Sequence, residues 1–200
     1  MRKLLTTLFA SAMLVAAMDA KADTLRLGDA AYGGTGCPAG SASVTVSPDQ
    51  QALSILFDSY VTEAGYTTNK QIDRKSCNIT IPVQVPQGYS VAVFAVDYRG
   101  FNALPNGGRS RFNAEYFWAG SRGPLMSRNF VGPLNSDYTL TNNLIASSLV
   151  WAPCGASINL RVNTSMMVTT NSAYDQAMAT VDSADVKSGM IYHLQWRRCN

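Results

Sequence analysis

Few residues of this 200-residue chain have side chains suited to catalysis. His193 is the single histidine, so a Ser-His-Asp triad would have to use it as the base. The Gly-x-Ser-x-Gly turn that carries the nucleophile of many hydrolases is absent from the sequence. His193 also lies in an alternating run, on the parity opposite to Tyr192, Leu194 and Trp196. We therefore interpret it as a structural or solvent-facing histidine.

A pair of carboxylates is the next candidate, because glycoside hydrolases need two such groups. Glu63 and Glu115 are the only glutamates, and Glu115 lies among aromatic residues. Asp97 ends a long apolar run and would approach Glu115 if their strands paired; a retaining mechanism needs carboxyl groups about 5 Å apart. The alternative is that Asp97 pairs with Arg99 or Arg111, and Glu115 with another arginine, which would fix strand ends.

The sequence predicts neither a metal nor a cofactor. The cysteines form no Cys-x-x-Cys pair, and a lone histidine cannot form a His-Glu-x-x-His motif. The glycine-rich segment 33–40 lacks the Lys-Ser/Thr pair of a phosphate-binding loop, so it is interpreted as a tight turn. Asp182 and Asp185 lack the spacing of a calcium loop and are interpreted as part of a solvated turn.

Aromatic residues and arginines near one strand end indicate a binding face. Rings close to arginines and amides are the chemistry of sugar-binding and protein-binding surfaces. The predicted ligand-binding residues are Asp97, Tyr98, Arg99, Phe101 and Asn102, with Glu115, Trp118 and Arg122 as neighbours. The alternative is that the rings form the core with cation–π contacts, because Tyr116 and Trp118 share the parity of Phe112 and Ala114.

The N-terminal segment predicts export. A basic start at Arg2 and Lys3 precedes a mostly apolar segment, and Ala20-Lys21-Ala22 offers a small-x-small cleavage site. We therefore predict a signal peptide over residues 1–22, cleaved near Ala22. The apolar segment 4–17 is shorter than the roughly 20 residues that span a bilayer. The expected location is periplasmic or secreted, without membrane insertion.

The charge of the remaining chain argues against a nucleic-acid or anionic membrane partner. Of the 16 basic and 13 acidic residues, three basic ones and one acidic one lie in the predicted leader, which leaves a net charge of +1. Nucleic acid and anionic membranes both require a basic surface.

Four cysteines in an exported chain indicate two disulfides, with three connectivities possible. We favour Cys37–Cys77 and Cys154–Cys199, which would fasten the two ends of the domain separately. Each bond would close a loop of about 40 residues, worth roughly 4 kcal/mol in the chain-entropy model.

Hydrophobic residues alternate with a period of two over much of the chain. Such runs include 53–57, 79–85, 158–162 and 192–196, separated by Gly/Pro turns. Residues 89–98 are apolar on both parities, as in a central strand covered on both faces. Residues 174–179 would form at most one helical turn. The pattern predicts one all-β domain over 23–200, a two-sheet antiparallel, jelly-roll-like sandwich.

Several strings carry a resemblance to a known family. They are GTGCPAGSASVTVSPDQQALSILFDSY, RKSCNITIPVQVPQGYSVAVFAVDYRGF, AEYFWAGSRG, FVGPLNSDY, VWAPCGASINLRVNTS and YHLQWRRC. Together they resemble exported bacterial and fungal proteins grouped as domain of unknown function family 4360, over Gly34 to Cys199. The resemblance implies secretion and a β-rich single domain, and it implies no activity and no site residue.

These observations favour a non-enzymatic binding protein that recognises a glycan or a protein at or outside the cell surface. The alternatives are a glycan hydrolase using Asp97 and Glu115, a protease inhibitor, and a structural envelope or matrix protein.

Overall fold

The computed structural model describes residues 24–181 and 189–199, which form two packed β-sheets. The predicted leader and cleavage site, and Asp182 and Asp185, lie outside the described residues. Sheet A contains β1 (Arg26–Leu27), β2 (Ala31–Gly33), β6 (Ile72–Gln84), β8 (Arg109–Trp118), β9 (Leu125–Val131) and β11 (Ser157–Thr169). Sheet B contains β3 (Ala42–Val46), β4 (Ala52–Phe57), β5 (Val61–Ala64), β7 (Tyr89–Leu104), β10 (Leu134–Asn143), β12 (Ala177–Thr180) and β13 (Met190–Arg198).

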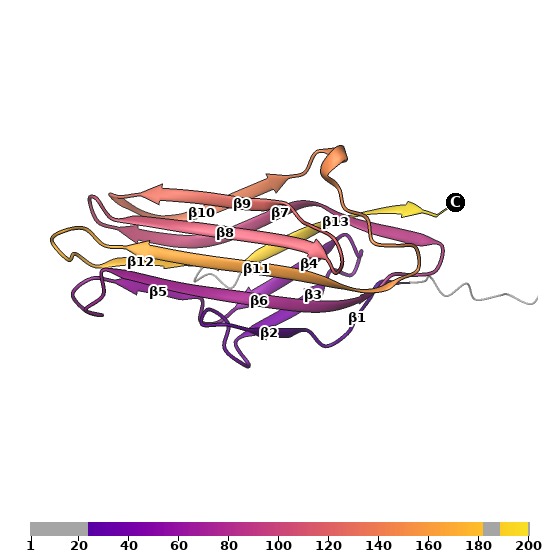
Figure 1. Ribbon diagram of the computed structural model, residues 1–200, viewed down its shortest axis with the longest axis horizontal. Helices are drawn as coiled ribbons and strands as arrows, with labels where there is room; N and C mark the ends of the chain where they lie inside the picture. The colour runs from indigo at the N-terminus through magenta and orange to yellow at the C-terminus, as the bar shows by residue number, and fades with distance from the viewer. Residues whose placement is uncertain (1–23, 182–188, 200) are drawn as a thin grey trace, which may run out of the picture.

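The two sheets lie one behind the other when the molecule is viewed down its shortest axis (Figure 1). The strand order is β1-β6-β11-β8-β9 in sheet A, with β2 also on β6. The order in sheet B is β3-β4-β13-β7-β12-β5, with β10 also on β7. The paired strands run antiparallel. In the part of the chain that is described, the one helical element is a 3₁₀ turn, η1 (Ala146–Ser148). The all-β sandwich predicted from the sequence is confirmed.

Alternating side chains build the core between the sheets. Leu53, Ile55 and Phe57 of β4 are buried, as their period of two predicts. Rings from the two sheets meet there: the Tyr98 and Phe112 centroids lie 5.1 Å apart and the Tyr116 and Tyr192 centroids 5.5 Å apart. These contacts identify the inward parity on the strands of the candidate site.

Strand β7 is central in sheet B, as its apolar run predicts. Its first half is buried on both parities from Ser90 to Val93. The pairing with β13 shifts register between His193 and Leu194, opposite Ala95 and Val93. The extra residue, Phe94, has a side chain that is 41% exposed. This bulge reverses the parity, so the inward residues are odd-numbered before it and even-numbered after it.

Two disulfides fasten the sandwich. Cys37, in the segment before β3, bonds to Cys77 of β6. Cys154, in the segment before β11, bonds to Cys199 at the C-terminal end. Both pairs are those favoured from the sequence.

Residues 174–179, for which at most one helical turn was predicted, contain the start of a strand, because the residues from Ala177 pair with β5 and β7 as β12. Pro82 of β6 lies where the neighbour of that strand changes from β2 to β1. A proline, which has no N–H to donate, is tolerated at such a place.

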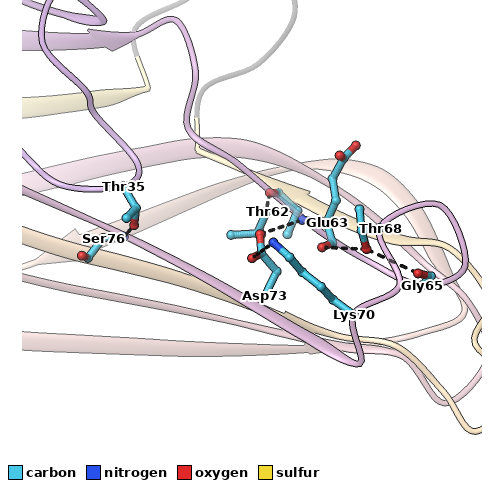
Figure 2. A network of polar contacts seen from close by, with 9 residues as sticks. Thr35, Thr62, Glu63, Gly65, Thr68, Lys70, Asp73 and Ser76 are labelled. Atoms are coloured by element: carbon cyan, nitrogen blue, oxygen red, sulfur yellow. Dashed lines mark hydrogen bonds and ion pairs between the residues drawn. The ribbon is translucent and has the colours of Figure 1, made fainter.

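The connection from β5 to β6 leads the chain from sheet B to sheet A and is held by polar contacts (Figure 2). Lys70 Nζ lies 2.9 Å from Asp73 Oδ1, and the Glu63 backbone N–H donates to Asp73 Oδ2 over 3.2 Å. The Thr68 hydroxyl lies 3.3 Å from the Gly65 carbonyl oxygen, to which it donates. These bonds fix the start of β6.

Candidate binding face

The predicted site residues on β7 divide between its two sides. Asp97, Arg99 and Phe101 are partly exposed on the outer face of sheet B. Tyr98 and Asn102 are 0% exposed on the inner face, where the Asn102 side-chain oxygen accepts a hydrogen bond from Ser110. Neighbouring residues of a strand point to opposite faces, so Tyr98 and Asn102 support the site from the core and do not line it.

Trp118 and Arg122, the two predicted site residues near the end of β8, also differ in their exposure. Trp118 is 4% exposed, and its indole N–H donates to the Val150 carbonyl oxygen over 3.0 Å. It belongs to the core together with Tyr116. This agrees with the alternative interpretation of the sequence, in which these rings form the core. Arg122 is exposed in the turn that follows β8.

Asp97 and Glu115 lie on different sheets. Strand β7 belongs to sheet B and β8 to sheet A, and both side chains have the outward parity of their strand. Glu115 stands in register with Asn163 and Leu125 on the outer face of sheet A. The two strands do not pair, so the condition under which Asp97 would approach Glu115 is not met. The core separates the two carboxylates, so they cannot act together as a glycosidase pair.

Asp97 is held by two side chains from neighbouring strands. The Thr141 hydroxyl on β10 donates to Oδ1 over 2.6 Å, and His193 Nε2 on β13 lies 2.9 Å from Oδ2. Burial raises the pKa of Asp97, but the hydrogen bonds from Thr141 and His193, with the charges of His193 and Arg99, outweigh it and lower the pKa. The expected pairing of Asp97 with an arginine is replaced by a pairing with histidine.

His193 faces outward, as its parity predicts, and it contacts an aromatic ring. Its ring centroid lies 5.9 Å from that of Phe94. The hydroxyl of Thr141 bonds to the carboxylate and not to the imidazole. In a triad the nucleophile bonds to the imidazole, so Thr141 is not placed as one. The arrangement presents fixed hydrogen-bonding groups beside an exposed ring.

A second aromatic group lies further along the same face. The Arg197 guanidinium lies 4.2 Å from the centroid of the Trp151 ring, a cation–π contact. Trp151 forms an isolated bridge with Ala92 of β7, and Arg197 pairs with Ser90 of the same strand. Sequence reasoning missed Trp151 because it lies in a non-strand segment that only the fold brings to β7.

We use the name β7 face for the outward side chains of β7 together with the side chains that lie beside them on neighbouring segments. Phe94 was also missed, because a bulge cannot be read from an apolar run. The β7 face consists of Phe94, Asp97, Arg99, Phe101, Thr141, Trp151, His193 and Arg197.

Residues 24–181 and 189–199 contain neither a metal-binding cluster nor a helix that could span a membrane. No group of three or more His, Cys, Asp or Glu side chains is placed to hold a metal ion there. Within the same residues no helix has the length and apolar character needed to cross a membrane.

Comparison with known proteins gives one curated relative. The chain is 33% identical over 178 residues to an "Uncharacterized secreted protein" of Arthroderma benhamiae, which covers 88% of this chain and 73% of the relative.

Two solved structures show weak likeness. One is TmCBM61 in complex with β-1,4-galactotriose, with a TM-score of 0.29, 10% identity, and coverage of 84% of this chain and 88% of the other. The second is tailspike protein 4 of bacteriophage CBA120, with a TM-score of 0.29, 15% identity, and coverage of 83% and 19%. At these TM-scores neither likeness bears on the ligand of this chain.

The model of one family matches almost the whole of the described chain. Its description is "Domain of unknown function (DUF4360)", and the match runs over residues 23–199. With a match of that extent, the chain belongs to the DUF4360 family.

Proposed function

We propose that this protein is an exported, non-enzymatic binding domain that holds a glycan on the β7 face. The observation that carries the proposal is the Asp97–His193 pair, 2.9 Å apart and fixed beside the exposed ring of Phe94. A sugar presents a C–H face to an aromatic ring and hydroxyl groups to fixed acceptors and donors, and this combination offers both.

The polar groups of the face are held before a ligand arrives. Asp97 receives a hydrogen bond on each carboxylate oxygen, and its side chain is 18% exposed. Each carboxylate oxygen has a further lone pair, so Asp97 can accept a sugar hydroxyl without losing its protein partners. Because little side-chain freedom is then lost on binding, such preorganisation favours affinity.

The rings are spread along the strand. Phe94 and Phe101 lie on opposite sides of Asp97, and Trp151 lies nearer the start of β7. The distance from residue 94 to residue 101 along an extended strand is roughly 23 Å, enough for several sugar units of a chain. An extended glycan chain is therefore the ligand class that this face fits.

Export is the second part of the proposal. Its supports are the leader-like residues 1–22, the family match beginning at residue 23, the two disulfides and the name of the fungal relative. Disulfides persist in oxidising compartments outside the cytosol.

A glycan array probed with residues 23–200, disulfides intact, tests the binding role. Saturable binding to one class of glycan chain is expected. A blank array, together with capture of a specific extracellular protein through the β7 face, would replace the glycan by a protein partner. Cleavage of an array glycan, abolished by Asp97→Asn, would replace the binding role by an enzymatic one.

A further inference from the structure

The outer face of sheet A carries three arginines close together, on the side of the sandwich away from the β7 face. Arg74 on β6 and Arg111 on β8 are both in register with Met167 of β11, which lies between them. Arg109 lies two residues before Arg111, on the same side of β8. Spacings of about 5 Å between strands and 3.4 Å per residue put these three Cα positions within roughly 12 Å of each other.

The arginines are exposed, and no acidic side chain neutralises them in the portion of the chain that is described. Asp73, next to Arg74 in the sequence, is bonded to Lys70 and to the Glu63 backbone N–H (Figure 2). The other carboxylate with an ion pair, Asp97, bonds to His193 on the opposite sheet. The cluster therefore presents net positive charge to solvent.

One of these arginines is fixed in position. The Nε–H of Arg111 donates to the side-chain oxygen of Asn129 on β9 over 2.8 Å. A guanidinium held in this way keeps a pair of parallel donors for a planar acceptor such as a carboxylate.

A hollow of about 230 Å³ lies beside two of the three arginines, Arg109 and Arg111. Its lining includes Arg109, Arg111, Asn129, Val131, Met167 and Thr169. The volume is below the roughly 300 Å³ at which enclosing ligand pockets begin, so it fits one unit of a polymer. Val131 and Met167 supply apolar surface for a sugar ring, and Thr169 and Asn129 supply hydrogen-bonding groups.

We propose that this arginine cluster is a second binding site, which takes the carboxylate groups of an acidic, uronate-bearing polysaccharide. The positive charge selects an anionic ligand, the fixed guanidinium suits a carboxylate, and the mixed lining suits a sugar ring. The proposal does not rest on the β7 face, because the two sites lie on the outer sides of different sheets.

The test is affinity electrophoresis of residues 23–200 in gels containing polygalacturonate, neutral galactan or heparin. The cluster is disrupted by Arg111→Gln, which removes the fixed guanidinium that also lines the hollow. The matched control is Arg161→Gln, which also removes one charge from the outer face of sheet A, at a position on β11 six residues and roughly 20 Å from Met167. Urea unfolding midpoints within about 0.3 M of the wild-type value establish that the variants are folded.

The proposal predicts retardation by polygalacturonate and not by galactan. It predicts at least tenfold weaker polygalacturonate binding in Arg111→Gln and less than twofold change in Arg161→Gln. The proposal is overturned by absence of retardation, by equal loss in the Arg161 control, or by heparin binding tighter than polygalacturonate, which would indicate a general polyanion surface.

Discussion

His193 Nε2 and Asp97 Oδ2 lie 2.9 Å apart on neighbouring strands of sheet B, separated by 96 positions in the sequence. Thr141, from the strand on the other side of β7, bonds to the second oxygen of the same carboxylate. Three strands thus converge on one carboxylate on the outer face. This convergence stabilises the surface locally and gives it a defined pattern of donors and acceptors.

The Asp97→Asn substitution is expected to lower stability in a pH-dependent way. The pKa of Asp97 is below its ordinary value in the folded protein, so the carboxylate stabilises the fold above the unfolded pKa. That contribution is lost as the pH falls through the lowered pKa. We expect a cost of about 0.5–1 kcal/mol at pH 7, in the range of partly exposed ion pairs, and a smaller cost near pH 2.

Urea unfolding at both pH values measures this difference. Asp137→Asn, an exposed change on β10, is the matched control. A cost for Asp97→Asn that is unchanged at pH 2 would show that the charge is not its cause.

Trp118→Ala is expected to act on stability rather than on recognition. The side chain is 4% exposed, and the variant loses the hydrogen bond from the indole N–H to the Val150 carbonyl oxygen. Truncation of a buried aromatic residue costs about 3–5 kcal/mol. Thermal unfolding measures the loss. Normal stability with impaired ligand binding would instead return Trp118 to the binding surface.

Removal of the Cys37–Cys77 bond by a double Cys→Ala variant is expected to cost about 2–4 kcal/mol, because the unfolded chain regains the freedom of the closed loop. The same range applies to Cys154–Cys199, which closes a loop of similar length, 45 against 40 residues. Guanidinium unfolding measures both costs. Peptide mapping of the non-reduced protein should recover only these two pairs, and a Cys37–Cys154 peptide would contradict the topology.

Gly100→Ala is expected to destabilise the strand beneath the β7 face. A Cβ at Gly100 would lie 2.1 Å from the Thr180 carbonyl oxygen and 2.5 Å from the Tyr138 hydroxyl oxygen. Those two groups bond to each other over 2.8 Å, so neither can move freely. We expect a loss of about 1–3 kcal/mol, as for an overpacked core. Gly33→Ala, where no atom lies within 4 Å, should cause no loss.

Alternation in the sequence predicted which side of each strand is buried, because a period of two follows directly from strand geometry. The alternation identified the inward-facing residues of β4 and β8 correctly. The predicted site nevertheless combined Asp97 with Tyr98, although adjacent residues of a strand face opposite ways. Parity applied strictly would have removed Tyr98 and Asn102.

Partners of strands are decided by packing and are not encoded locally. Strands β7 and β8 follow each other across the turn at residues 105–108, and consecutive strands often pair. Here they enter different sheets, which separates Asp97 from Glu115. The contact of Trp151 with Arg197 depends on a non-strand segment crossing β7, and no periodicity reports such a crossing.

The measurement that tests the central claim most directly is the glycan array run in parallel with wild-type protein, Phe94→Ala and Tyr66→Ala. Both substitutions truncate an exposed ring, but Tyr66 lies at the β5–β6 connection, outside the β7 face. We expect a glycan signal that Phe94→Ala weakens at least tenfold and Tyr66→Ala leaves intact. With acidic glycans set aside, since the arginine cluster is proposed to bind them, a signal that is equally strong in both variants, or no signal for the wild type, would contradict a glycan site on the β7 face.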